Sequence, residues 1–325
     1  MRAGIKGTGM YVPPKVISND DLVAMGIETT DEWIRTKTGM QLRHIAEDDV
    51  CTSDLAAKAG EAALKDAGVK PEDVDMLILA TSSPDVILSS TAAITQAKLG
   101  CSNSGAFDVN SVCSGFVYAF DIGSRMVLDP HMDNVLVIGA ELYSKILNWE
   151  DRTTCIYFGD GAGATLLQKT DEGGVLGSYL KADGTGASVI EIPAGGTRQR
   201  LTKELIGSGQ EYFHMDGRAV WNFATVKYGE AITEVTKRAG FKVDDVDWVI
   251  PHQSNSTMIK VCMENLGLPY EKAYLNLEKY ANCAGASIPI AIHEAAKDGS
   301  LKKGDIVATV GYGGGLSWGS NLIEW

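Results

Sequence analysis

The chain has 325 residues, of which 45% are hydrophobic, so it can build one large or two ordinary domains around a substantial core. Its formal net charge of −13 disfavours nucleic acid and anionic membranes as partners, because no cluster of lysine and arginine offsets it. The sequence shows no signal-peptide pattern and no apolar stretch near the roughly 18 residues of a membrane helix. We therefore expect a globular, cytoplasmic protein.

The cysteines indicate neither a metal site nor a disulfide framework. They show no C-x-x-C pair and no cysteine–histidine ligand spacing, so we expect reduced thiols and no metal. The six cysteines are Cys51, Cys101, Cys113, Cys155, Cys262 and Cys283.

Apolar strands and helical patterns alternate along the chain. In the first part we expect strands at 4–10, up to Thr81, at 106–109 and at 135–139, with helices from Thr30, over 52–66, up to Leu99 and after Ser114. In the second part we expect a strand up to Ile250, a helix ending at Leu266, a segment at 273–277, a helix from about Ala284 and a strand at 306–310. This alternation favours an α/β architecture with parallel strands covered by helices.

One segment of the chain occurs twice. Residues 65–78 and 237–250 share Ala-Gly, a lysine, Asp-Val-Asp and the apolar run that follows, all in register. Such agreement indicates two related halves, 1–172 and 173–325, that join near 171–174. A duplicated α/β unit usually has its active site where the halves meet.

Cys113 lies at the junction between an extended apolar segment and a helical pattern. Phe116, Phe120 and Val127 recur at helical spacing after it, so the thiol is expected at a helix N-terminus, where the backbone favours a thiolate. A thiol with a lowered pKa there is suited to attack a thioester carbonyl. A small buried residue is an equally good reading of this stretch alone.

Three further stretches carry candidate chemistry. His252 follows the repeated strand in a loop, where α/β proteins place functional groups, although a lone histidine is more often structural. Asn282 opens the second-half counterpart of the cysteine region, and a helix cap is its simpler reading. The glycines of 311–315 would let a backbone approach a substrate and present N–H groups to an oxyanion.

Two other motifs are misleading. Residues 315–319 fit the G-x-S-x-G of serine hydrolases, but that motif needs a following helix, for which no room is left. Residues 159–164 loosely fit a dinucleotide fingerprint, yet a strand over 165–168 follows, so we interpret them as a tight glycine turn between two strands.

Taken together, these motifs resemble β-ketoacyl-acyl-carrier-protein synthase III essentially from end to end. The stretches that carry the resemblance are Asp-Val-Asn-Ser-Val-Cys113-Ser-Gly, Phe158-Gly-Asp-Gly-Ala-Gly163, Pro251-His252-Gln-Ser-Asn255, Asn282 with the later Ala-Ser-Ile-Pro, and Gly311-Tyr-Gly-Gly-Gly-Leu-Ser-Trp-Gly-Ser320. The resemblance implies a thiolase-like α/β fold, duplicated in five layers α-β-α-β-α, and a homodimer.

The resemblance also implies the chemistry. Cys113 would be acylated by an acyl-CoA, and His252 and Asn282 would hydrogen-bond the thioester carbonyl of a malonyl extender as it loses carbon dioxide. Backbone donors at Gly314 and Cys113 would hold the tetrahedral oxyanion. The acyl-CoA is a substrate and no cofactor is implied; the extender would be carried by an acyl carrier protein or by coenzyme A, in the first step of fatty-acid or related synthesis.

Further positions match substrate-binding residues of that family. Trp33 and Arg152 would hold the coenzyme A nucleotide, and the remaining coenzyme A contacts would come from Lys37, Gly217 and Asn255. Lys37 stands where the family has an arginine. Leu88 occupies a position that is commonly aromatic and that reaches across the dimer interface into the partner's acyl pocket, so we expect primers longer than acetyl to be accepted.

The surface where an acidic carrier protein would dock has few basic residues. The matching positions are Asn222, Thr257, Glu264 and Asn265, with Lys260 as the main positive charge and Arg218 or Lys227 as possible substitutes. We therefore expect weak docking of a typical carrier.

Related activities remain as alternatives. A thiolase would need a second catalytic cysteine, for which only Cys283 is available, a hydroxymethylglutaryl-CoA synthase would need a glutamate, and chalcone-type synthases are longer. A ketosynthase-III-like acyltransferase of secondary metabolism, using another acceptor or malonyl-CoA, is the closest alternative. A catalytically inactive scaffold is disfavoured because all three candidate residues are retained.

Overall fold

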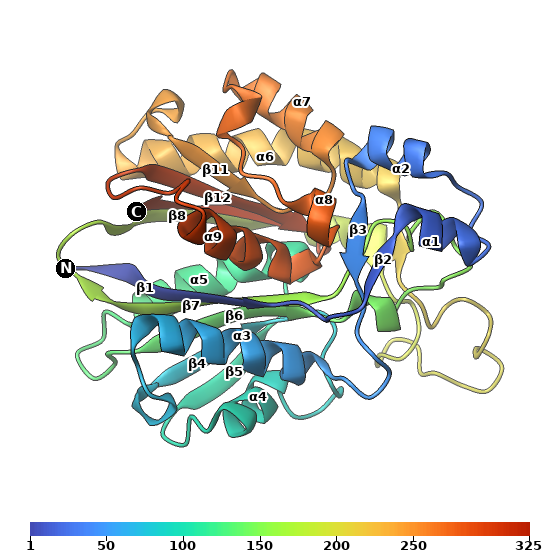
Figure 1. Cartoon of the computed structure of the whole chain (residues 1–325), viewed down its shortest axis with the longest axis horizontal. Coiled ribbons are helices and arrows are strands. Elements are labelled where there is room, and N and C mark those ends of the chain that lie inside the picture. Colours follow the sequence, from blue (N-terminus) through green and yellow to red (C-terminus); the bar gives the residue numbers. More distant parts are fainter.

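Two β-sheets, one from each half of the chain, form the frame of the protein in the computed structural model, which describes residues 1–325 (Figure 1). The first sheet has the order β1-β7-β6-β4-β5, with β1 at Arg2–Tyr11, β4 at Met76–Ala80, β5 at Gly105–Val109, β6 at Val135–Glu141 and β7 at Gly161–Thr170. The second has the order β11-β12-β13-β8, with β8 at Gly174–Ala182, β11 at Trp248–Pro251, β12 at Ile306–Gly313 and β13 at Ser317–Glu324.

The two sheets are built alike. In the order β1, β7, β6 and β4, the strands of the first sheet correspond to β8, β13, β12 and β11 of the second, and β5 corresponds to a single bridge between Val249 and Ala273. The expectation of parallel strands is only partly right. Strand β4 is parallel to β5 and β6, and β11 is parallel to β12, but the other neighbours are antiparallel.

Helices form three layers around the sheets, which gives the five-layer α-β-α-β-α arrangement that the resemblance implied (Figure 1). Helices α3 (Thr52–Ala67) and α4 (Thr91–Leu99) cover the outer face of the first sheet, and α6 (Gly217–Ala239) covers the outer face of the second with α7 (Ser256–Leu266) packed on it. Helices α5 (Gly115–Met126) and α9 (Ser287–Lys297) lie between the sheets and contact both.

The repeated segment shows why both halves fold in the same way. Helix α3 ends at Ala67 and α6 ends at Ala239, and the next residue, Gly68 or Gly240, adopts a left-handed conformation with φ of +70° or +81°. Glycine takes this conformation without steric cost, so Ala-Gly ends the helix at equivalent places. The apolar run that follows becomes β4 in one half and β11 in the other.

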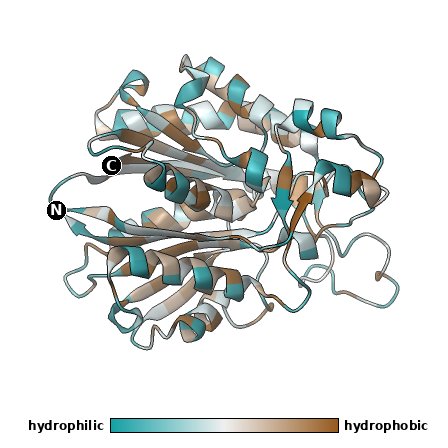
Figure 2. Ribbon diagram, viewed as in Figure 1, coloured by the Kyte–Doolittle hydropathy of each residue, from teal (hydrophilic) through white to brown (hydrophobic).

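The middle layer is apolar because it is buried on both sides. Phe116 and Phe120 of α5 and Ile288 of α9 belong to one core cluster with Ile78 of the first sheet and Ile250 of the second. Figure 2 accordingly shows the strands mostly pale to brown and the outer helices with teal faces toward solvent. No helix has the length and hydropathy needed to cross a bilayer.

Glycines let the middle helices come very close to the sheets. A Cβ atom on Gly163 of β7 would lie 2.5 Å from the backbone nitrogen of Ile290 in α9, and one on Gly313 of β12 would lie 2.8 Å from the backbone nitrogen of Cys113. The interpretation of 159–164 as a turn between two strands is therefore wrong. The preceding strand, β6, ends well before them at Glu141, β7 already begins at Gly161, and its glycines make room for the other half of the chain.

The remaining elements lie mainly at one end of the molecule, where Figure 1 shows α1, α2, β2 and β3 together. They are β2 (Val16–Ser18), α1 (Asn19–Ala24), α2 (Asp31–Thr38), β3 (Leu42–His44), β9 (Ile190–Glu191), β10 (His214–Met215) and α8 (Leu277–Tyr280). Strand β13 begins at Ser317, the serine of the G-x-S-x-G sequence, so a strand stands where a serine-hydrolase elbow would have its helix.

Candidate active site

The structure brings Cys113, His252 and Asn282 to one largely apolar cavity between the halves. Strand ends position the first two residues: Cys113 comes shortly after β5, and His252 comes directly after β11. Asn282 is positioned by a β-bridge to Phe158. The other residues that line the cavity are Tyr157, Phe158, Ile190, Phe213, Met215, Gly217, Val220, Trp221, Ser254, Asn255, Met258, Tyr312 and Gly313.

Cys113 is the middle residue of a 3₁₀ turn, Val112–Ser114, that leads directly into α5. The predicted position of Cys113 at the start of a helix is thus correct. The prediction that the pKa of its thiol is lowered is wrong. Burial raises the pKa of the Cys113 thiol, the nearby Glu141 adds to this, and the residue's own backbone N–H opposes it. Without a ligand, the thiol of Cys113 is therefore neutral, because its surroundings desolvate the anion.

His252 is held in its neutral form. It is 2% exposed, and burial lowers the pKa of its imidazole to about 3, although the adjacent backbone of Ala284 opposes the shift. The backbone nitrogen of His252 donates to the carbonyl of Val310 in β12 over 2.8 Å, which continues the parallel ladder into the loop. A neutral imidazole keeps one N–H that can donate to a substrate oxygen.

Asn282 is fixed by its neighbours so that its amide nitrogen remains available. Its backbone bonds with Tyr157 and Gly159, and its side-chain oxygen Oδ1 accepts from the backbone N–H of Ala284 over 2.8 Å. The oxygen is thereby assigned to the protein, and the side-chain NH₂ is the group left for a ligand. His252 and Asn282 can both donate hydrogen bonds into the cavity.

The glycine stretch lies against the nucleophile, but the lining glycine is Gly313 instead of Gly314. Gly314 lies next to it against Val112 and Ile190, and its carbonyl oxygen accepts from the Ser317 hydroxyl over 2.7 Å. The close approach of β12 to Cys113 explains why this stretch is rich in glycine.

Glu141, which sequence analysis did not select, lies buried behind the cysteine. Its carboxylate accepts hydrogen bonds from the backbones and hydroxyls of Ser82 and Ser83, and burial raises its pKa to about 7 against these bonds. A Cβ atom on Gly285 would lie 3.0 Å from its Oε1 atom. A single buried glutamate at the end of a strand carries no sequence pattern, so only the fold reveals its position.

The cavity also has aromatic walls that the sequence did not indicate. Tyr143 stacks on Phe158 with ring centroids 4.7 Å apart, and Phe213 packs edge-on against both. Phe213 lies outside the regular elements, so no periodicity marks it as a wall residue. By contrast, Cys283 is buried and does not line the cavity, and its thiol donates a hydrogen bond to the Tyr280 carbonyl. It therefore cannot act as a second nucleophile in this cavity.

The candidate coenzyme A residues fall into two groups. Gly217 and Asn255 line the cavity, at the first turns of α6 and α7. Trp33 and Arg152 lie outside the lining but pair with each other, with the guanidinium carbon 4.9 Å from the ring centroid. Lys37 is exposed on α2, and its carbonyl accepts from Thr257 at the start of α7, beside the cavity wall.

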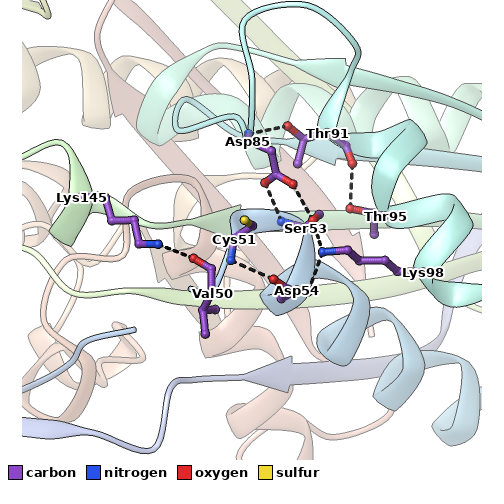
Figure 3. A network of polar contacts seen from close by, with 9 residues as sticks. All are labelled: Val50, Cys51, Ser53, Asp54, Asp85, Thr91, Thr95, Lys98 and Lys145. Carbon is purple, nitrogen blue, oxygen red and sulfur yellow. Dashed lines mark hydrogen bonds and ion pairs between the residues drawn. The ribbon is translucent and has the colours of Figure 1, made fainter. Parts of the chain in front are cut away.

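Leu88 does not line the cavity of its own chain. It is 84% exposed at the tip of the loop 84–90, together with Ile87 at 85%. The base of this loop is firmly held: Asp85 accepts from the backbone and hydroxyl of Ser53 and donates its own N–H to Thr91, as Figure 3 shows. An anchored loop that presents apolar side chains to solvent is typical of an interaction surface.

Known proteins resemble this chain along its full length. Family models of 3-oxoacyl-[acyl-carrier-protein] synthase III match residues 107–184, and models of its C-terminal part match residues 236–325. The β-ketoacyl-[acyl-carrier-protein] synthase III of Caldanaerobacter subterraneus is 48% identical over 324 residues, 99% of this chain and 98% of that protein.

Solved structures agree. The 3-oxoacyl-[acyl-carrier-protein] synthase III of Aquifex aeolicus superposes with a TM-score of 0.91 at 39% identity, over 99% of this chain and 100% of that one. The priming β-ketosynthase of the R1128 polyketide pathway superposes with a TM-score of 0.90 at 29% identity, over 99% and 96%. The predicted thiolase-like fold is confirmed. The chain belongs to the β-ketoacyl-acyl-carrier-protein synthase III family, and it is therefore an acyltransferase of the condensing type.

Proposed function

We propose that the protein condenses an acyl-CoA primer with a malonyl thioester, through an acyl group carried on Cys113, and so initiates fatty-acid synthesis. The observation that carries this proposal is the meeting of one thiol and two neutral hydrogen-bond donors, from His252 and Asn282, in one largely apolar cavity. The names of the relatives point to the same substrates, acyl groups and acyl carrier protein.

In the first half-reaction the Cys113 sulfur attacks the acyl-CoA carbonyl. A carbon–sulfur bond forms to the enzyme, the bond to coenzyme A breaks, and the thiol proton ends on the released coenzyme A. Burial raises the pKa of Cys113, so the thiol must be deprotonated while it attacks. Backbone N–H groups of Cys113 and the neighbouring Gly313–Gly314 segment are the candidate oxyanion donors.

In the second half-reaction the malonyl group loses carbon dioxide. The electron pair of the broken carbon–carbon bond forms an enolate, and N–H donors of His252 and Asn282 stabilise its oxygen. The enolate carbon then attacks the acyl-cysteine, and the carbon–sulfur bond breaks to return the thiolate. Uncharged donors in an apolar cavity favour the loss of a charged carboxylate as a neutral gas.

The reaction needs no metal or prosthetic group, and acyl-CoA acts as a substrate. Trp33, Lys37, Arg152, Gly217 and Asn255 are proposed to bind coenzyme A. The stacked Trp33–Arg152 pair offers a flat, cationic surface suited to a nucleotide. Because the substrates are coenzyme A and carrier thioesters and all six cysteines are free, a cytoplasmic location is part of the proposal, without nucleic acid or membrane as partners.

A homodimer is also part of the proposal, with 1–172 and 173–325 as the two halves of each subunit. Strand β5 is an open edge of the first sheet, and the exposed apolar tip of 84–90 lies in the connection that leads through α4 to β5. Open edges and apolar tips are usually covered by a partner. Analytical ultracentrifugation tests this directly: a monomer at micromolar concentration contradicts it.

Intact-mass measurement tests the reaction. After incubation with a panel of acyl-CoAs, the protein should gain one acyl mass, Cys113→Ala should gain none, and the control Cys283→Ala should still gain one. His252→Ala and Asn282→Ala should accept the acyl group yet lose decarboxylation of malonyl thioesters by at least about 100-fold. Acylation of Cys113→Ala, or label on another cysteine, would contradict the proposed mechanism.

A second candidate is a ketosynthase-III-like acyltransferase of secondary metabolism that uses another acceptor or malonyl-CoA, and the likeness to a 29% identical enzyme of a polyketide pathway favours it. Product analysis with malonyl donors and other acceptors separates the two: a 3-oxoacyl thioester supports condensation, and an acyl ester or amide supports the second candidate.

A further inference from the structure

A functional histidine is usually oriented by a well-formed hydrogen bond, whereas the polar group close to the His252 imidazole is the backbone of Ala284. The inner ring nitrogen of His252, Nδ1, is buried and has no hydrogen-bond partner. In most catalytic histidines one nitrogen is fixed by a carbonyl or carboxylate, and this sets both the tautomer and the plane of the ring. In His252 the contact with Ala284 leaves the Nδ1 atom without a partner, so packing must help to set the plane of the ring.

Tyr312 supplies that packing. It belongs to β12, is 2% exposed, and lines the same cavity as His252. The two rings are edge-on to each other, with centroids 5.5 Å apart and planes at 78°. On its other side Tyr312 contacts Tyr228 of α6, with centroids 6.2 Å apart. The tyrosine ring is thus held between α6 and the imidazole.

Ser254 fixes the hydroxyl end of this tyrosine. The oxygens of Ser254 and Tyr312 lie 2.6 Å apart, which is a short hydrogen bond between hydroxyls. Ser254 is part of the loop that carries the histidine, because its backbone N–H donates to the carbonyl of His252 over 2.9 Å. Tyr312 therefore contacts this loop twice: its hydroxyl hydrogen-bonds to Ser254, and its ring packs on His252.

The Tyr312 hydroxyl needs the hydrogen bond with Ser254 more than the Ser254 hydroxyl does. The only other contact of the Tyr312 hydroxyl is the Met258 sulfur, 3.5 Å away and a weak acceptor, so loss of Ser254 leaves a buried hydroxyl poorly satisfied. Ser254 is only half-buried and can turn to other acceptors if Tyr312 loses its hydroxyl. Removal of both hydroxyls leaves two apolar groups in contact, which costs little.

We propose that Ser254 and Tyr312 form a matched positioning pair that sets the plane of the His252 imidazole for malonyl decarboxylation. This inference rests on the proposed role of His252 and adds two residues to it. Neither side chain need touch the reacting atoms.

The test uses single and double variants of the full chain with a malonyl thioester. Ser254→Ala should lower kcat for decarboxylation about tenfold and leave KM within about twofold, since a misaligned donor acts in the transition state. Tyr312→Phe alone should cost about twofold, and adding Tyr312→Phe to Ser254→Ala should restore kcat to within about threefold of the original chain.

Two controls separate positioning from a general loss of structure. In all three variants, acylation of Cys113 should fall less than decarboxylation does. Tyr274→Phe, which removes a tyrosine hydroxyl bonded to Asp298 outside the cavity, should leave kcat unchanged. The proposed role of Ser254 and Tyr312 is contradicted if kcat is unchanged in Ser254→Ala, or if the double variant is no faster than Ser254→Ala. If His252→Ala still decarboxylates, the role of His252 in the proposed function is itself wrong.

Discussion

Replacing Gly163 with alanine should destabilise the protein much more than the same replacement of Gly177 in the edge strand β8. The new Cβ atom would lie 2.5 Å from the backbone nitrogen of Ile290 and 2.6 Å from the backbone carbon of Pro289. Ordinary contacts of this kind begin near 3.4 Å, so α9 would have to move by about 0.9 Å. Both obstacles are backbone atoms of a buried helix, and such overpacking costs about 3 kcal/mol.

Urea unfolding measures this cost, as a shift of the midpoint at constant slope. The matched control is Gly177→Ala in β8, where the new Cβ would be 3.6 Å from its nearest neighbour, an ordinary contact. We expect that control to stay within about 0.5 kcal/mol of the original chain. Because α9 begins shortly after Asn282, Gly163→Ala should also slow decarboxylation. Equal stability of the two variants would refute the close-approach explanation of this glycine motif.

Three further predictions concern pH, primer and carrier. Burial lowers the pKa of His252 to about 3, so between about pH 6.5 and pH 3 the histidine is protonated in the unfolded chain and neutral in the folded chain. The free energy of unfolding therefore decreases as the pH falls through this range, by up to about 5 kcal/mol at pH 3. The stability difference between the original chain and His252→Asn should therefore shrink on acidification, and a constant difference in urea titrations from pH 7 to pH 4 would contradict this. Leu88→Phe should shift primer preference toward acetyl-CoA in a competition assay, and strict acetyl-CoA preference in both forms would contradict a roomy pocket. Malonyl on an acyl carrier protein and on coenzyme A should be used about equally with little salt dependence, since Lys227 is neutralised by Glu230 at 2.6 Å; carrier-dependent turnover that falls steeply with salt would refute this.

The sequence repeat predicted the larger features of the fold because it marks equivalent helix ends and buried strands. Ala-Gly and the apolar run after it gave the turns from α3 to β4 and from α6 to β11. The strand directions escaped prediction, because a fully buried strand has the same apolar pattern whether its neighbour is parallel or antiparallel. The antiparallel pairing of β7 and β13 with their neighbours was missed for this reason.

Sequence analysis found those site residues whose side chains have few common roles in proteins. A cysteine before a helix and a histidine after a strand could be selected from the chain alone, and the structure brings both to one cavity. The pKa of Cys113 could not be predicted, since it depends on burial and on Glu141, which approaches through the fold. The Ser254–Tyr312 contact joins residues far apart in the sequence and leaves no local pattern.

The nucleophile and the amide donor occupy two copies of the same backbone turn. The 3₁₀ turns Val112–Ser114 and Ala284–Ala286 both open with a positive φ, +47° at Val112 and +42° at Ala284. In each copy the side-chain oxygen of an asparagine two residues earlier, Asn110 or Asn282, accepts the N–H of that residue.

Superposing the turns places Gly285 where the first half has Cys113, since both are the central residues. A side chain at Gly285 would meet the buried Glu141 carboxylate at 3.0 Å. A side chain in the second copy would therefore require the Glu141 carboxylate to shift by a few tenths of an ångström. A duplicated backbone thus yields one nucleophile and one hydrogen-bond donor, and the tight space between Gly285 and Glu141 favours glycine at the centre of the second turn.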